Sequence, residues 1–278
     1  MTDNAIVTKK ADLKTLLNNP AIKSRFESVL GKNAGAFIAA VLNTAVSNPD
    51  IMLCEPLSVI NSALQAAVLG LSISPALGQA AIVPFNSKTG KKAQFQPMKN
   101  GYIQLALRTN QYRYIHVGKI YEGETWTEDR FTGKMVFKGG RTGDGIIGLV
   151  AYFQLLNGYE KYLVMSIDEL LAHGKRYSKS YDRKNDCFYP GSFWADNPMK
   201  AYEKTIIKLL IKSYGILSDR MEQALEIENE TGEEIITGAM VEEAAEEVAT
   251  EKPADNPATP QPEDTKTPEQ ILLELGYQ

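Results

Sequence analysis

The chain has 278 residues, 44% of them hydrophobic, and its 30 Lys and Arg against 34 Asp and Glu give a formal net charge of −4. Its start lacks the basic residues and continuous apolar run of a signal peptide, and no stretch reaches the roughly 18 uninterrupted apolar residues of a membrane span. We therefore expect a cytoplasmic protein with no membrane partner. Cys54 and Cys187 form no Cys-x-x-Cys pattern and there are only two histidines, so we expect reduced thiols and no metal site.

The net charge is the sum of two opposed parts. Residues 1–221 carry 28 Lys and Arg against 18 Asp and Glu, whereas residues 222–278 carry 2 against 16. A basic body joined to an acidic tail is typical of a protein that binds a polyanion. We expect a folded core at 1–221 that binds the polyanion, and an acidic, Pro-containing disordered linker at 222–266. Residues 267–278 then form either a short partner-docking helix or a frayed terminus.

Helical patterns come first along the chain, and a hairpin follows them. Apolar residues keep helical spacing at 33–48, and Pro56 begins a second helix that Gly70 ends. Strand-like segments at 81–85 and 93–96 flank a polar link, which predicts a hairpin. The tip of this hairpin carries three lysines, and a short helix is expected after it at 101–109; the lysines are Lys88, Lys91 and Lys92.

Three further strands are expected in the middle of the chain. Residues 112–121 alternate, although both sides of the alternation mix polar and apolar groups. The segments 146–156 and 159–167 are joined by Asn157-Gly158, the strongest short hairpin signal in a sequence. These patterns predict an α+β fold in which N-terminal helices accompany an antiparallel β-sheet with hairpins.

Two helices complete the expected core. Ser166 and Glu169 match a capping box, which begins a short helix that ends near His173 and Gly174. Asn197 and Pro198 form a cap and first turn for a long basic helix that ends at Gly215 and packs on the sheet.

A nucleic-acid interface is indicated by the basic segment 173–186 and the long helix after it. The segment interleaves cations with tyrosines, and lysines recur every fourth residue of the helix along a line of about 18 Å. Such a line could follow a DNA backbone, although it also occurs on solvated helix faces. Basic groups bind phosphates and aromatic rings stack on unpaired bases. The candidate DNA-binding residues are Lys175, Arg176, Lys179, Arg183 and Lys184 in the segment, Trp194 after it, Lys200, Lys204 and Lys208 on the helix, and Arg113 and Lys119 on the strand at 112–121.

Enzyme motifs are absent or out of context. Gly143, Gly145 and Gly148 match G-x-G-x-x-G, but they lead into a strand-like run, whereas the dinucleotide fingerprint needs a strand before it and a helix after it. The segment 89–92 lacks the first glycine and the Ser/Thr of a Walker A motif, and the chain has no Glu-x-Lys or Gln-x-Lys pair of a common nuclease type. We therefore expect no catalytic residue and no cofactor.

Four segments, taken in order, resemble the RecT family of phage-type recombinases over roughly residues 35–218. They are 66–85 (AAVLGLSISPALGQAAIVPF), 95–124 with Gly101 and Arg108, 165–170, and Trp194 with the following Met199-Lys200 and Lys204-Thr205. The resemblance implies an ATP-independent single-strand DNA annealing protein for recombination and repair, encoded by a phage or prophage and acting in a bacterial cytoplasm. It implies binding to single-stranded DNA and to the annealed duplex, and self-assembly into a homo-oligomeric ring or helical filament. A phage exonuclease and the host single-strand-binding protein are expected partners of the C-terminal tail.

Carried over residue by residue, the resemblance favours Arg108, Lys200 and Lys204 as DNA contacts and Trp194 as a packing or base-adjacent aromatic. Many family members place a basic or aromatic residue just before the glycine matched by Gly101, where this chain has Lys99-Asn100, so both of these residues are candidates. Two other classes of protein stay open. A phage capsid or scaffold protein could also carry a basic face, and a nuclease would cleave DNA in the presence of Mg²⁺.

Overall fold

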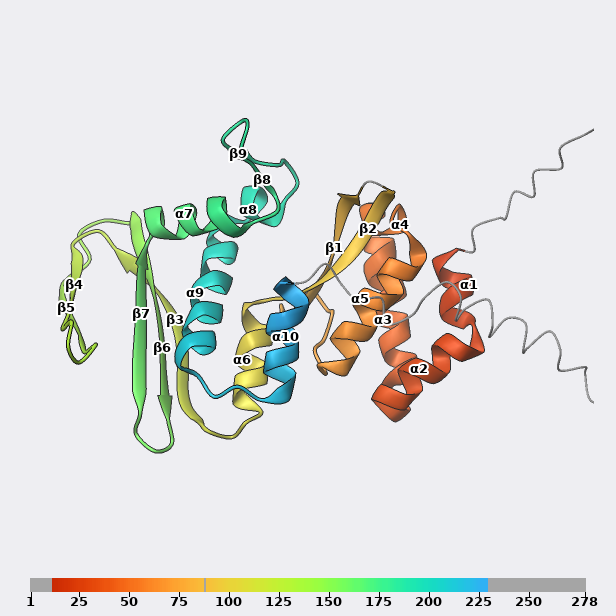
Figure 1. Cartoon of the computed structure of the whole chain (residues 1–278), viewed down its shortest axis with the longest axis horizontal. Helices are drawn as coiled ribbons and strands as arrows, with labels where there is room; N and C mark the ends of the chain where they lie inside the picture. Colours follow the sequence, from red (N-terminus) through yellow and green to blue (C-terminus); the bar gives the residue numbers. More distant parts are fainter. Residues whose placement is uncertain (1–11, 88, 230–278) are drawn as a thin grey trace, which may run out of the picture. The chain divides into compact units, whose positions relative to one another are not determined.

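The computed structural model describes residues 12–87 and 89–229 (Figure 1). All of them lie within the unit Met1–Gly238. Lys88 of the expected hairpin tip, most of the expected linker and the expected docking helix lie outside the described residues. Within the described part the fold is α+β, with N-terminal helices followed by antiparallel sheets, as the sequence predicts.

The N-terminal part is helical. Asp12, Asn19 and Asn48 each accept a hydrogen bond from a backbone N–H of the helix that follows, which explains where three of the helices begin. The predicted helices at 33–48 and from Pro56 are confirmed, and Gly70 has a φ of +63° just beyond the second one. The elements are α1 (Leu13–Asn18), α2 (Pro20–Leu30), a 3-10 turn (Gly31–Asn33), α3 (Ala34–Ser47), α4 (Pro49–Met52) and α5 (Pro56–Val68). Residues 59–67 of α5 are all buried, so α5 is the central helix of this part.

One apolar segment of the described chain, Pro20–Ser47, has the length and composition to cross a membrane, with a mean hydropathy of 1.3. A single segment near the N-terminus is weak support for a membrane span, because a core helix of a soluble protein passes the same test. Here the segment is two helices separated by the 3-10 turn, where Gly31 adopts a φ of +54°.

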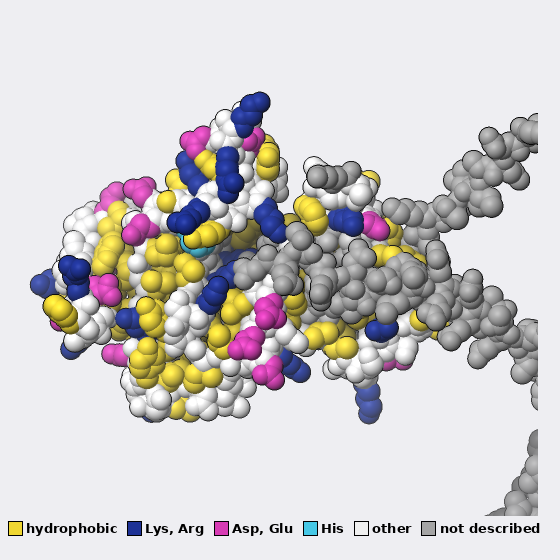
Figure 2. Space-filling view, in the orientation of Figure 1, with side chains coloured by type: hydrophobic (Ala, Val, Ile, Leu, Met, Phe, Trp, Pro, Cys, Tyr) yellow, Lys and Arg dark blue, Asp and Glu magenta, His cyan; other side chains and the backbone are white. Residues whose placement is uncertain are grey.

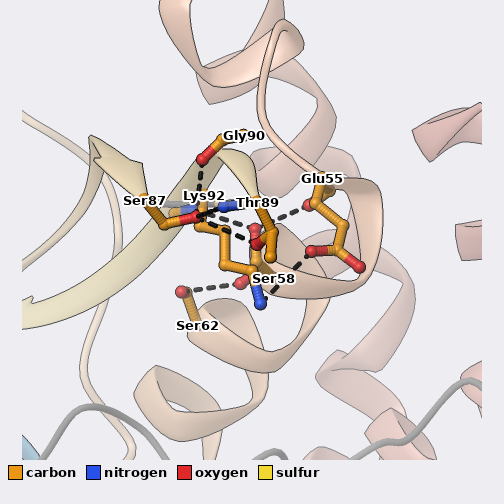
Figure 3. Close-up of polar contacts among 8 residues, drawn as sticks. Glu55, Ser58, Ser62, Ser87, Thr89, Gly90 and Lys92 are labelled. Atoms are coloured by element: carbon orange, nitrogen blue, oxygen red, sulfur yellow. Dashed lines mark hydrogen bonds and ion pairs between the residues drawn. The ribbon is translucent and has the colours of Figure 1, made fainter.

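The predicted lysine hairpin is confirmed as β1 (Ala80–Ser87) and β2 (Gly90–Pro97), which pair antiparallel. Its second strand is bonded to the start of α5 (Figure 3): the Ser58 hydroxyl accepts from the Ala93 N–H at 2.8 Å and donates to the Glu55 carbonyl at 2.6 Å. Lys92 lies 3.5 Å from the Glu55 carboxylate, and Lys91 lies 2.5 Å from that of Asp50. Two of the three tip lysines are therefore paired with acidic groups of the helical part. The next helix, α6 (Lys99–Leu107), begins two residues before its predicted start.

The central sheet has the strand order β3-β6-β7 and is antiparallel throughout. Its strands are β3 (Tyr112–Tyr121), β6 (Ile146–Leu155) and β7 (Glu160–Ser166), and the turn between the last two contains Gly158 at a φ of +88°. The predicted strands and their Asn-Gly hairpin are thus confirmed. The glycine-rich run leads into β6, as expected, so no dinucleotide-binding helix follows it. A separate ribbon of β4 (Glu124–Glu128) and β5 (Met135–Gly139) was not predicted.

The register of the sheet separates a core face from an outer face. Ile115 and Val117 lie opposite the buried Phe153 and Ala151 of β6, on the face that contacts the helices. Tyr114 and His116 lie opposite Gln154 and Tyr152 and belong to the outer face; Tyr114 is 61% exposed. The register shifts by one residue between Tyr112 and Tyr114, which marks a β-bulge at Arg113.

The remaining elements are α7 (Ile167–Tyr177), β8 (Tyr181–Asp182), β9 (Cys187–Phe188), α8 (Phe193–Asp196), α9 (Pro198–Tyr214) and α10 (Asp219–Asn229). The capping box of Ser166 and Glu169 is confirmed, but α7 continues one turn past its predicted end near Gly174. The long helix α9 packs on β6 and β7, as predicted, although the Asn197 side chain makes no capping hydrogen bond. Helix α10 crosses residue 221, and Met221 and Ala224 on it are fully buried.

Candidate nucleic-acid interface

The basic segment 173–186 forms the end of α7 and the hairpin β8–β9. The Asp182 carboxylate accepts from the backbone N–H groups of Lys184 and Asn185 at 2.9 and 3.3 Å, which closes the hairpin turn. The side chains of Arg176, Lys179, Arg183 and Lys184 are exposed around this turn. Figure 2 shows Lys and Arg side chains gathered on the protruding region that holds β8 and β9.

Lys175 differs from these cations because it is paired with a carboxylate of the fold. Its ammonium lies 2.9 Å from the Asp186 carboxylate, which also accepts from the Tyr181 hydroxyl. Tyr181 and then Lys175 lower the pKa of Asp186, so this carboxylate stays ionised and offsets the charge of Lys175. The hairpin is thereby fixed to the last turn of α7.

Trp194, predicted as either a packing or a base-adjacent aromatic, lies in a packed position. Its ring stacks on Phe188 with centroids 5.3 Å apart and meets Tyr202 edge-on at 5.8 Å. It also lies against the backbone of Gly174, where a Cβ atom would be 2.3 Å from the indole. Trp194 therefore holds α7, β9 and α9 together, and only glycine fits at position 174.

The lysines of α9 do not form one exposed line. Lys200 and Lys212 are exposed, whereas Lys204 is 7% exposed and donates to the Gln96 side chain of β2 at 3.3 Å. Lys208 is half-buried. Because each step of four residues turns the helix by about 40°, a line of lysines that starts in solvent passes over the packed side of the helix.

His173 lies beside Lys208 in the packed region between α7 and α9. Burial lowers the pKa of His173, and the charges of Lys208 and Arg176 lower it further. Its Nδ1 atom is buried without a hydrogen-bond partner among the described residues. The two cations beside this imidazole make the local potential positive, which favours an anion nearby.

The candidates on α6 all have partners within the chain. Arg108 donates to the Leu69 and Gly70 carbonyls at 2.8 and 2.6 Å. These carbonyls follow the last turn of α5, where backbone acceptors lack partners within the helix. Lys99 lies 2.8 Å from the Glu203 carboxylate of α9, and Asn100 donates to the Leu77 carbonyl at 2.8 Å. These contacts give the three residues a positioning role, and their contact with DNA stays a prediction.

Arg113 and Lys119 belong to β3 and not to the segment on α7 to α9, and both are exposed. An open cavity of about 390 Å³ is lined by Arg108 together with Arg220, a cation that our reading of the sequence missed. Arg220 lies six residues after the end of α9, outside the basic segment 173–186 and the long helix to which the sequence pattern pointed. Within residues 12–87 and 89–229, no group of three or more His, Cys, Asp or Glu side chains is placed to hold a metal ion.

Comparison with known proteins gives the family. The model of the RecT family matches residues 35–247 of this chain. The chain belongs to the RecT family. It is 38% identical over 260 residues to the uncharacterized protein YqaK of Bacillus subtilis (strain 168), an alignment that covers 92% of this chain and 85% of YqaK. It is 26% identical over 166 residues to Protein RecT of Escherichia coli (strain K12), covering 57% of this chain and 62% of that protein.

Membership in the RecT family confirms the resemblance seen in the sequence and gives a general function. RecT proteins are single-strand annealing proteins of DNA recombination rather than classical enzymes, and they bind single-stranded DNA and self-associate. They belong to phage and host recombination in the cytoplasm. The chain is accordingly a DNA-binding recombination protein of this kind.

Proposed function

We propose that this chain anneals complementary single DNA strands without ATP, holding one strand on its basic surface while a second strand pairs with it. Membership in the RecT family carries the proposal, and the exposed cations around β8–β9 support it. The cations that we assign to phosphate contacts are Arg176, Lys179, Arg183, Lys184 and Lys200.

Annealing follows from binding the strand by its phosphates. Phosphate contacts fix the position of a strand but leave its base edges free to test a partner strand. Each correct stacked step then adds roughly 1.4 kcal/mol, so base pairing supplies the specificity. The protein needs no sequence readout of its own in this scheme.

A homo-oligomer is part of the proposal because one folded unit of about 220 residues covers too little DNA to hold a testable register. Head-to-tail contacts generate a ring or an open helix. Light scattering in the presence of single-stranded DNA should detect particles much larger than a monomer. A monomer at every DNA concentration would contradict this part of the proposal.

We further propose that the acidic C-terminal segment keeps the basic body from binding other polyanions and docks onto a partner, either a phage exonuclease or the host single-strand-binding protein. Residues 230–278 carry 13 Asp and Glu against 2 Lys. Like charges repel at low ionic strength, so such a segment stays away from DNA. We also infer that the gene belongs to a phage or prophage.

The experiment mixes the protein with two complementary oligonucleotides without ATP and follows duplex formation at several salt concentrations. We expect annealing faster than the spontaneous reaction, and binding to one strand that weakens as salt rises. A plot of the logarithm of the binding constant against the logarithm of the salt concentration should be less steep for the variant R183Q/K184Q, by about 0.7 for each lost phosphate contact. The matched control is K14Q/K32Q, which removes two exposed lysines of the N-terminal helices.

The same assay separates the alternatives. A phage scaffold protein with a basic face would bind DNA without accelerating annealing, and a nuclease would shorten the oligonucleotides when Mg²⁺ is added. Annealing no faster than the spontaneous reaction would contradict the proposed function.

A further inference from the structure

The outer strand β3 presents cations and aromatic rings together. β3 is at one side of the three-stranded sheet, and four of its ten side chains are polar or aromatic groups exposed to solvent. They are Arg113, Tyr114, His116 and Lys119. The mixture explains why the alternation of 112–121 is impure: the exposed positions are not simply polar.

Tyr114 and His116 lie on the face of the sheet opposite the core. They pair with Gln154 and Tyr152, not with the buried residues of β6. On the same face the rings of Tyr152 and Tyr162 lie 4.4 Å apart and are inclined by 31°. Planar side chains therefore run across all three strands, and the two on β3 are the most exposed of them.

The imidazole of His116 lies along the strand rather than standing away from it. Its Nε2 atom is 3.0 Å from the point that a Cβ atom at Gly118 would occupy. The absence of a side chain at position 118 leaves room for the ring to lie over the backbone. The His116 ring and the exposed Tyr114 side chain thus lie on the same face of the strand.

Aromatic residues of the basic segment, and Trp194 after it, make contacts within the fold. Trp194 is stacked on Phe188, and the hydroxyl of Tyr181 bonds to Asp186. Tyr177 is 62% exposed, but its ring lies 4.6 Å from that of His173. A base-stacking function therefore fits the rings of β3 better than those of Trp194 and Tyr181.

Arg113, the bulged residue, precedes Tyr114, and Lys119 follows His116 on the outermost strand, opposite Leu149. Both cations are exposed, so phosphates that pass along this edge of the sheet can contact them.

We propose that β3 is a binding site for unpaired bases of single-stranded DNA, in which Tyr114 and His116 stack on bases while Arg113 and Lys119 bind phosphates. This inference rests on the proposed function and extends it by a site for bases. Residues i and i+2 of a strand are about 6.6 Å apart, whereas stacked base pairs of a duplex are 3.4 Å apart. Bases on the two rings are thus drawn apart from each other, which suits an unpaired strand and excludes a stacked duplex.

The test compares Tyr114→Leu with Tyr114→Phe, and uses Phe131→Leu as the matched control. Phe131 is a fully exposed aromatic residue between β4 and β5. The probes are a labelled thymidine oligonucleotide and an oligonucleotide of the same length made of abasic sites, with binding followed by fluorescence anisotropy. We expect Y114L to weaken binding to the thymidine strand by about 5- to 100-fold and to leave binding to the abasic strand unchanged. Y114F and F131L should bind both strands as the unaltered protein does.

Salt dependence separates the two kinds of contact. Y114L should lower the affinity equally at every salt concentration, whereas R113Q/K119Q should reduce the log–log slope by about 0.7 per lost contact. Equal affinities of Y114L and F131L, or an equal loss on the abasic strand, would overturn the inference. So would a change in the particle size of DNA-free Y114L, because the face would then be a contact between copies. If the unaltered protein bound no single strand at all, the proposed function itself would fail.

Discussion

The indole of Trp194 lies between Phe188 and the backbone of Gly174, so its removal should cost folding energy rather than DNA affinity. For W194A we expect a loss of about 2–4 kcal/mol in the free energy of unfolding, typical of a large aromatic residue removed from a packed site. Urea unfolding measures the loss, and F131A, at an exposed position, is the control. If W194A kept its stability but lost DNA affinity, the base-adjacent role would hold instead.

His173 makes the stability of the protein depend on pH. Burial, followed by the charges of Lys208 and Arg176, places its pKa below the ordinary value of 6.5. As the pH falls through that value, the unfolded chain binds a proton before the folded chain does, so the folded state loses stability. His173 makes its full contribution to the free energy of unfolding above pH 6.5. This contribution is lost as the pH falls through the pKa that His173 has in the folded chain. Urea unfolding at pH 7.5 and pH 5.5 should show a smaller decrease in the free energy of unfolding for H173Q than for the unaltered chain, and an equal decrease would contradict this role of His173.

At the scale of elements, the lysines of α9 should divide into two kinds. Lys200 is exposed, whereas Lys204 is 7% exposed and bonded to Gln96. We expect K200Q to lower the salt slope of DNA binding by about 0.7 without a change in stability. K204Q should lower the free energy of unfolding by about 1–2 kcal/mol and leave the slope unchanged. The opposite pattern would place Lys204 at the DNA and Lys200 outside the interface.

The elements that the sequence predicted are those with local signals. The Asn157-Gly158 turn and the capping box of Ser166 and Glu169 depend on neighbouring residues alone, and both are confirmed. The ribbons β4–β5 and β8–β9 were missed because their strands are short and carry too many charges and glycines for a clear alternation. Helices α1 and α2 were also missed, although Asp12 and Asn19-Pro20 were available as caps.

The candidate site was predicted only in part, because contacts between residues far apart in the sequence leave no local signal. The basic segment, the long helix and its lysines were visible in the sequence, but the partners of the cations were not. Spacing cannot tell that Lys175 pairs with Asp186, or that Arg108 binds the carbonyls at the end of α5. Which side of a helix faces the core depends on what packs against it, so the burial of Lys204 followed only from the fold.

At the scale of the whole molecule, the boundary between core and tail can be tested by truncation. Met221 and Ala224 are fully buried and Leu225 is 6% exposed, so α10 contributes to the core beyond residue 221. We expect a chain of residues 1–229 to anneal DNA as well as or better than the full chain, and to lose binding to its partner. A chain of residues 1–221 should be less stable, as measured by thermal unfolding. Loss of DNA binding by the 1–229 chain would contradict the assigned role of the tail.

The 28 Lys and Arg of residues 1–221 overstate the number of cations that are free to meet DNA. Several lysines are paired with carboxylates within the fold, and surface pairs of this kind are worth little for stability but still offset charge locally. The pairs are Lys91 with Asp50, Lys92 with Glu55, Lys99 with Glu203 and Lys175 with Asp186. The interface is therefore defined by the cations that remain, mainly those of β8–β9, the exposed ends of α9 and β3.

The bulge at Arg113 decides which residues of β3 face the core and which face the solvent. Tyr112 faces the core opposite Leu155, yet Tyr114, two residues later, faces outward, because one extra residue is inserted between them. If Arg113 took a regular place in the pairing, opposite Gln154, every later residue of the strand would shift by one and change face. Tyr114 and His116 would then point to the core, and Ile115 and Val117 to the solvent. A chain from which Arg113 is deleted should instead keep both Tyr112 opposite Leu155 and Tyr114 opposite Gln154, in a strand without a bulge. The unpaired place of Arg113 thus decides whether this strand turns its rings or its aliphatic side chains toward the solvent.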